Sequence, residues 1–185
     1  MTRWTVAAAA ACTSLLLNGC EDAGRPTAPG PLSAAVAGRE TRQVQMMDAC
    51  DGESFNAALG AGTCARKGGV PFGQFLKLLG KHQTAGAWHF APATLNVRVG
   101  QTLLAVNQGG EVHTFTEVEE FGGGIVPELN ALSGNPVPAP ECLALAPGDF
   151  VPPGGSHTDE VERPGTERYE CCIHPWMRAT VHARQ

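Results

Sequence analysis

The most informative stretch of the chain is YECCIHPWM, residues 169–177. It brings together a thiol, an imidazole and a thioether, because Cys171, His174 and Met177 follow one another at intervals of three residues. A single loop folded around one ion can present all three side chains. A soft thiolate and imidazoles, with a weak and long thioether bond, are the ligand set of a type 1 copper site. The motif therefore predicts one copper ion near the end of the chain.

Such a site needs a second imidazole, which we expect from a distant strand. The best candidate is His113, which lies in NQGGEVHTF, residues 107–115, next to a glycine turn. Taken alone, His113 would more often be a histidine of the core or of a turn, and its position upstream of the loop motif makes it the predicted ligand. The weaker candidates are His89, His157 and His182.

The loop contains two adjacent cysteines, and only one can be the ligand, because neighbouring side chains of a strand point to opposite faces. Two residues separate Cys171 from His174, which lets the loop turn so that sulfur and nitrogen converge. A single residue separates Cys172 from His174 and leaves little room to turn. We therefore predict Cys171 as the thiolate. A metal-free disulfide between the two cysteines is the alternative.

The residues around the motif predict an all-β fold. Short segments at 88–90, 94–99, 102–107, 112–118, 167–172 and 179–183 are apolar or alternate apolar with polar residues. Gly and Pro turns separate them, which is typical of an antiparallel β-sandwich. An irregular connection is expected over residues 121–141. These features assign residues 87–185 to the copper-binding domain.

The preceding residues 43–86 predict an extension with short helices. Ser54 is a candidate cap for a helical turn that ends at Leu59. Residues 71–79 place apolar side chains at i, i+3, i+4 and i+7, the spacing of a helix with one apolar face, and Gly80 is the predicted stop.

The first twenty residues predict an export signal. Arg3 precedes an apolar stretch at residues 6–17, and Leu-Asn-Gly-Cys follows at residues 17–20. This pattern resembles a bacterial lipoprotein signal, in which Cys20 would be lipidated; simple secretion with nearby cleavage is the alternative. Residues 21–42 are rich in Pro, Ala and Gly and predict a flexible linker. We expect a protein of the periplasm or cell surface, attached to the membrane only through this anchor.

The charge and the cysteine content narrow the range of partners and of cellular compartments. The net charge is −5 and there is no basic block, which argues against a nucleic-acid partner. The seven cysteines indicate an oxidising compartment or a metal site. Cleavage before Cys20 would remove Cys12, so setting Cys20 and the thiolate aside leaves four cysteines, and four allow three disulfide connectivities. We favour Cys50–Cys64, which are close in sequence, and Cys142–Cys172.

From residue 88 to its C-terminus the chain resembles the cupredoxins, or blue copper proteins. The resemblance rests on FAP at residues 90–92, HTF at 113–115, PGT at 164–166 and the ligand loop, whose C-x2-H-x2-M spacing is most similar to amicyanin and plastocyanin-like proteins. It implies a Greek-key β-sandwich with one type 1 copper ion and a role in electron transfer. It also implies that His113, Cys171 and His174 are equatorial ligands and that Met177 is the axial ligand.

The resemblance carries expectations for the surroundings of the ion. An Asn often follows the first histidine ligand in this family, and here Thr114 takes that place; its hydroxyl is expected to steady the ligand loop. His174 is expected to be the more exposed imidazole, where electrons enter and leave. Pro175 and Trp176 would form a small apolar patch around it for transient redox partner proteins.

Three functions compete. The first is a monomeric one-electron carrier, and the second is periplasmic copper storage or delivery, which ranks lower because the chain has only four Met. The third is a copper enzyme such as an oxidase or nitrite reductase. Such enzymes need further copper centres, usually with His-x-His pairs, and the chain contains none. We therefore expect a carrier and not an enzyme.

Overall fold

The computed structural model describes residues 40–185. The predicted export signal, the lipidated Cys20 and nearly all of the predicted linker lie outside the described residues. Among residues 40–185, no helix is both long and apolar enough to cross a bilayer.

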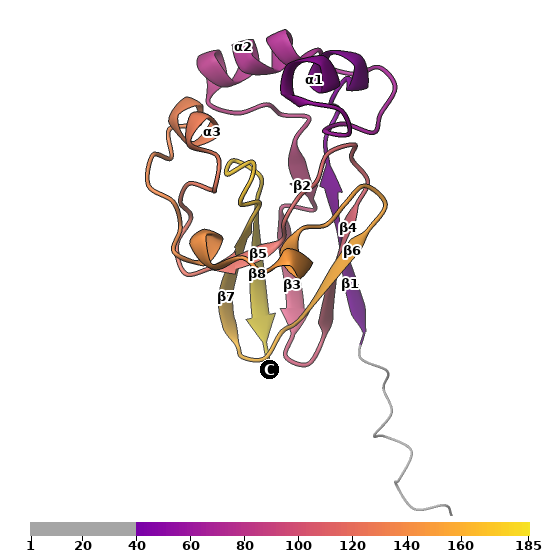
Figure 1. Ribbon diagram of the computed structural model, residues 1–185. Helices are drawn as coiled ribbons and strands as arrows, with labels where there is room; N and C mark the ends of the chain where they lie inside the picture. Colours follow the sequence, from indigo (N-terminus) through magenta and orange to yellow (C-terminus); the bar gives the residue numbers. More distant parts are fainter. Residues whose placement is uncertain (1–39) are drawn as a thin grey trace, which may run out of the picture. The chain divides into compact units, whose positions relative to one another are not determined.

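The described residues form a sandwich of two four-stranded sheets (Figure 1). The first sheet has the order β2 (His89–Ala91), β1 (Thr41–Met47), β4 (Thr102–Asn107) and β6 (Ser156–Glu160). The second has the order β3 (Thr94–Arg98), β8 (Arg178–Arg184), β7 (Gly165–Glu170) and β5 (Thr116–Val118). The predicted β-sandwich is confirmed.

The sheets are mixed, whereas the sequence predicted antiparallel pairing. β1 runs parallel to β4, and β3 runs parallel to β8; the other neighbours are antiparallel. Parallel neighbours need a long connection between them. Here the helical segment between β1 and β2 provides one, and the chain from β4 to β7 provides the other.

The core lies between the sheets and follows the two-residue period of the strands. β3, β4 and β8 alternate buried and more exposed side chains along most of their length. Aromatic rings fill the centre, where Phe115 stacks on Tyr169 with 4.3 Å between ring centroids and meets Phe90 edge to face at 5.3 Å.

Two strands were not predicted. β1 begins at Thr41, inside the expected linker, and pairs along β4 from Thr41↔Thr102 to Met46↔Asn107. Only Val44 and Met46 of this strand are fully buried, so its alternating pattern is short. β6, SHTDE, is an edge strand without a buried residue, and it therefore has no apolar alternation to detect.

The predicted helices are present with different ends. α1 spans Gly52–Leu59 and is capped by Asp51, whose side chain accepts a hydrogen bond from the Ser54 amide, so the prediction of Ser54 as the cap is wrong. α2 spans Phe72–His82 and continues through Gly80; the residue that caps its C-terminus is Gln83, whose φ of 57° is left-handed. The predicted stop at Gly80 is therefore also wrong.

The connection at residues 121–141 contains a short helix, α3 (Pro127–Leu132), that the sequence did not predict. The last of three consecutive glycines, Gly124, lets the connection approach the ligand loop. A Cβ on Gly124 would collide with the carbonyl oxygen of Cys172, and the next amide, of Ile125, donates to that oxygen at 2.7 Å. The described residues contain two disulfides, Cys50–Cys64 and Cys142–Cys172, which are the pairs favoured above.

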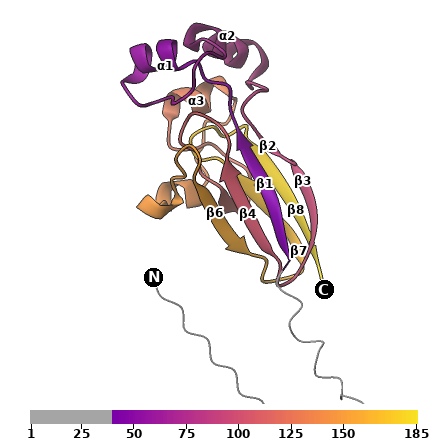
Figure 2. The same cartoon turned by 90° about the vertical axis from the view of Figure 1, so that its right-hand side faces the viewer.

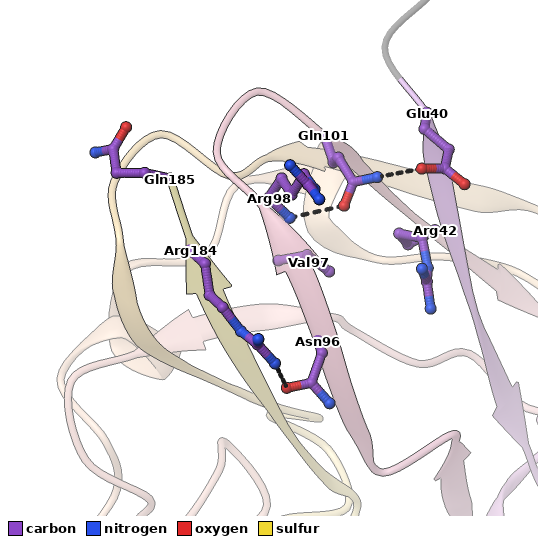
Figure 3. A pocket seen from close by; sticks show the side chains of 8 residues that line it. All are labelled: Glu40, Arg42, Asn96, Val97, Arg98, Gln101, Arg184 and Gln185. Atoms are coloured by element: carbon purple, nitrogen blue, oxygen red, sulfur yellow. Dashed lines mark hydrogen bonds between the residues drawn. The ribbon is translucent and has the colours of Figure 1, made fainter.

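The two ends of the sandwich differ. α1, α2 and α3 gather at one end, together with the loop between β7 and β8, and the C-terminus lies at the other (Figures 1 and 2). Near the C-terminus, Gln101 ties two elements together: its side chain donates to Glu40 at 2.7 Å and accepts from the Arg98 amide at 2.7 Å (Figure 3). Glu40, Arg98 and Gln101 line a polar pocket together with Arg42, Asn96, Val97, Arg184 and Gln185 (Figure 3). We assign this pocket a structural role.

Candidate metal centre

The ligand loop is a tight turn between two paired strands. β7 and β8 pair up to Glu170↔Arg178, which fixes the ends of the loop. Inside the loop the Cys171 amide donates to the Met177 carbonyl at 3.0 Å, and the Met177 amide donates to the His174 carbonyl at 2.8 Å. The backbone therefore holds the three predicted ligands of this loop close together.

Three predicted ligand side chains converge on one point. The sulfur of Cys171 lies 3.7 Å from Nδ1 of His113 and 3.7 Å from Nδ1 of His174. The three donor atoms all lie within 4.8 Å of one another. Cys171 and His113 are fully buried and His174 is 2% exposed. His113 comes from the segment before β5, so the fold joins two distant parts of the chain here.

These separations fit a metal ion bound at the centre of the group. A first-row metal bonds thiolate sulfur at ~2.3 Å and imidazole nitrogen at ~2.0 Å. With a bond angle of ~120°, those bond lengths separate sulfur from nitrogen by ~3.7 Å, whereas a tetrahedral angle gives ~3.5 Å. A His₂Cys set that fits a trigonal arrangement is the donor set of blue copper sites.

The fourth predicted ligand, Met177, is not part of the group of three donor atoms described above. It is fully buried at the end of the same turn, and its backbone is hydrogen-bonded to the backbone of Cys171 and of His174. This position suits a fourth, axial ligand, and ligation by its sulfur stays a prediction.

The adjacent cysteines face opposite sides. Cys171 packs in the main core and is the free cysteine of residues 40–185. Cys172 packs in a second, smaller cluster with its disulfide partner Cys142. The structure therefore offers Cys171, and not Cys172, to the two imidazoles.

A buried carboxylate orients His113. Asp48, just after β1, lies 2.9 Å from Nε2 of His113, and both side chains are fully buried. An ionised carboxylate only accepts hydrogen bonds, so Nε2 must carry the proton. In the neutral ring, which is the form that binds a metal ion, Nδ1 then carries the lone pair and faces Cys171. Such a carboxylate partner fixes the tautomer and ring orientation of a ligating histidine.

Asp48 is itself held in a cradle of backbone amides. One of its oxygens accepts from Gly110 at 2.8 Å and from Glu111 at 3.0 Å, and the other accepts from Cys50 at 3.1 Å. Residue 109 must be a glycine to leave space for the Asp48 carboxylate, since a Cβ at this position would collide with it. Burial opposes ionisation, but the hydrogen bonds from His113 and these amides outweigh it and hold the pKa of Asp48 well below its usual range.

His113 shifts the pKa values of Asp48 and Cys171, and each of these two residues shifts the pKa of His113. Burial lowers the pKa of His113, but Asp48 and Cys171 outweigh this and raise it to about 9. Burial raises the pKa of the Cys171 thiol, but His113 and His174 outweigh this and hold it well below the usual value. The cysteine is therefore poised as a thiolate, the form that binds metal.

His174 is slightly more exposed than His113, at 2% against 0%, as predicted, but both imidazoles are buried. Its Nε2 lies 3.7 Å from the Glu111 carboxylate, which accepts from the Trp88 indole at 2.6 Å. Burial, partly offset by His174 and Trp88, raises the pKa of Glu111. The Trp176 ring lies 5.4 Å from the His174 ring and 5.9 Å from Phe75 of α2. The extension thus covers the edge that was expected to face solvent.

The other expected neighbours have mixed outcomes. Thr114 makes the expected contact, because its hydroxyl accepts from the Cys172 amide at 2.8 Å, and its own amide approaches the Cys171 sulfur at 3.4 Å. Pro175 is buried and Trp176 is only half-buried, so the two residues do not form the exposed apolar patch that was expected.

The weaker histidine candidates stay outside the group. His89 and His182 are exposed on β2 and β8, and His157 is partly exposed on β6. Asp48 and Glu111 are the residues that the sequence analysis missed. Each is an isolated acidic residue outside any motif, and the only signal was the position of Glu111 two residues before His113.

No known protein-family model matches the chain, and no curated protein matches it. Among solved structures it is similar to a purple cupredoxin from Nitrosopumilus maritimus, at 15% identity over 77% of this chain and 98% of the other, with a TM-score of 0.44. A Cu(I) amicyanin variant matches at 19% identity over 52% of this chain and 73% of the other, with a TM-score of 0.36. Oxidised plastocyanin from Dryopteris crassirhizoma matches at 18% identity over 52% and 89%, with a TM-score of 0.37. These neighbours are cupredoxins, the family that the ligand loop resembles.

Proposed function

We propose that the protein is an exported mononuclear type 1 copper protein that carries one electron at a time. The observation that carries the proposal is the buried Cys171 sulfur with two imidazole Nδ1 atoms at 3.7 Å. His113, Cys171 and His174 are the equatorial ligands in this proposal, and Met177 is the axial ligand. Copper, when bound, supplies a one-electron redox couple.

The protein residues hold the donors in place. Asp48 keeps the proton of His113 on Nε2 and leaves Nδ1 free to coordinate. Thr114 places its amide against the Cys171 sulfur at 3.4 Å, and hydrogen bonding to this sulfur tunes the reduction potential of such sites. Because these groups are buried and mutually bonded, they limit rearrangement when the charge of the ion changes.

Export is supported by the covalent structure. Two disulfides among residues 40–185 are typical of proteins that mature in an oxidising compartment. The proposal places the protein in the periplasm or at the cell surface, anchored by a lipid on Cys20, as a monomer that meets redox partner proteins transiently. Storage or delivery of copper would favour an accessible ion, and the three donor side chains are buried.

Copper addition tests the proposal. Cu(II) added to the purified copper-free protein is expected to give an intense blue or violet colour from charge transfer between thiolate and copper. Cys171→Ser should abolish the colour, whereas the matched Cys172→Ser variant should keep it. A weakly coloured wild-type complex, or colour that survives Cys171→Ser, refutes the proposal.

A further inference from the structure

A largely apolar pocket lies beside the candidate centre. It is formed between α1, α2, α3 and the ligand loop and has a volume of about 530 Å³. Sites for small molecules typically measure ~300–1,000 Å³ and combine an apolar wall with a few polar groups. The pocket is therefore of a size that suits a small molecule.

The wall has a distinct chemistry. Phe55, Phe72 and Phe75 line it from the two helices of the extension, and Leu129 and Leu132 line it from α3. The phenyl rings already pair with one another, Phe55 with Phe72 at 5.2 Å and with Phe75 at 5.4 Å. Aromatic faces and edges favour a further ring in offset or edge contact. This wall therefore suits a flat, ring-containing ligand.

Two polar groups of the pocket come from the centre itself. His174 and Glu111 both line the cavity, and Glu111 is fixed by its hydrogen bond from the Trp88 indole at 2.6 Å. A fixed carboxyl group in an apolar cavity favours a ligand with one hydrogen-bonding hydroxyl and disfavours an anion, because a buried unpaired charge is costly. An occupant that meets Glu111 lies next to the imidazole of His174.

The pocket opens to solvent through apolar side chains. Leu59 of α1 and Leu76 of α2 line it and are 55% and 37% exposed. A ligand can therefore enter from outside and bury these leucines. By contrast, Leu143 is 69% exposed but does not line the pocket, so it provides a matched control.

From this wall, these polar groups and this volume, we infer that the pocket binds an uncharged aromatic molecule that carries a ring hydroxyl, placed against His174. Contact with a copper ligand rests on the proposed function, whereas occupancy of the pocket does not. The pocket would then give a small molecule a route to the centre, although the imidazole itself is buried.

Calorimetric titration of the purified protein, before and after copper loading, tests the inference with 4-propylphenol as the probe. Saturable binding at one site is expected in both states, and the anionic 4-propylbenzoate should bind at least about tenfold more weakly, or about 1.4 kcal/mol. Leu76→Glu should weaken binding of 4-propylphenol at least tenfold, and Leu143→Glu should leave it unchanged.

No saturable binding, equal binding of phenol and benzoate, or equal weakening by the two variants overturns the inference. The colour formed with Cu(II) is recorded on the same samples. A blue protein that does not bind the phenol refutes only the pocket, and a colourless protein that binds it refutes only the proposed copper function.

Discussion

The substitution Asp48→Asn tests whether the buried carboxylate supports the metal centre. It keeps the shape of the side chain and removes its charge. The amide can still accept, but its NH₂ group must then face one of the present donors, which include Nε2 of His113 at 2.9 Å and the Cys50 amide at 3.1 Å. At least one buried donor therefore loses its partner, and His113 loses the anion that fixes its tautomer.

The expected size of the effect follows from the role of the carboxylate as the partner of a ligating histidine. Loss of such a carboxylate partner typically weakens metal binding by about 10–100-fold, or about 1.4–2.8 kcal/mol. The lost negative charge stabilised Cu(II) more than Cu(I), because the attraction grows with the charge of the ion. If Cu(II) loses ten times more affinity than Cu(I), the reduction potential rises by about 59 mV.

Competition with chelators measures the affinity for each oxidation state, and a redox titration measures the potential. Asp51→Asn is the matched control, since it makes the same change three residues away on the solvent-accessible cap of α1, and Asn is also a good cap. We expect the control to bind copper as the wild type does. If Asp48→Asn has the affinity and potential of the control, the carboxylate does not support the site.

Four further results are expected. Met177→Leu should retain copper and raise the reduction potential in a redox titration, because a weak donor to Cu(II) is lost; an unchanged potential excludes axial ligation. Replacing both Cys142 and Cys172 with Ala should retain the colour but lower the free energy of unfolding by about 4 kcal/mol, because the disulfide closes a sequence separation of 30 residues. Burial raises the pKa of Glu170 from 4.5 to about 7, so chemical denaturation should show stability falling as the pH rises through this range, and Glu170→Gln should make that slope shallower. Cys20→Ser should move the protein out of the membrane fraction; equal fractionation of wild type and variant contradicts the lipid anchor.

The sequence predicted those parts of the centre that are encoded locally. The spacing of Cys171, His174 and Met177 places them in one short loop, and the opposite orientation of Cys172 follows from the alternation of a strand. The favoured disulfides followed from cysteine parity and proximity in sequence. Such inferences need no knowledge of how distant segments pack.

What the sequence did not predict depends on long-range contacts. Asp48 meets His113 across 65 residues, and nothing in the local pattern around Asp48 marks it as a partner. The burial of His174 depends on Trp176 and Phe75, which meet only after the extension has folded over the loop. α3 is also missed, because it has only six residues and starts with Pro127.

The position of Asp48 has a consequence for protein engineering. This residue belongs to the segment that leads from β1 to α1, whereas His113, the proposed ligand that it orients, belongs to the segment before β5. A ligand loop transplanted from this chain into another sandwich would bring the thiolate and one imidazole but leave the carboxylate behind. A transplant that keeps the whole site must therefore include residues 48–50 and the glycine turn at residues 109–110, next to which Asp48 lies, as well as the loop. Chimeras that exchange only residues 171–177 should acquire the spacing of this site without its charge balance.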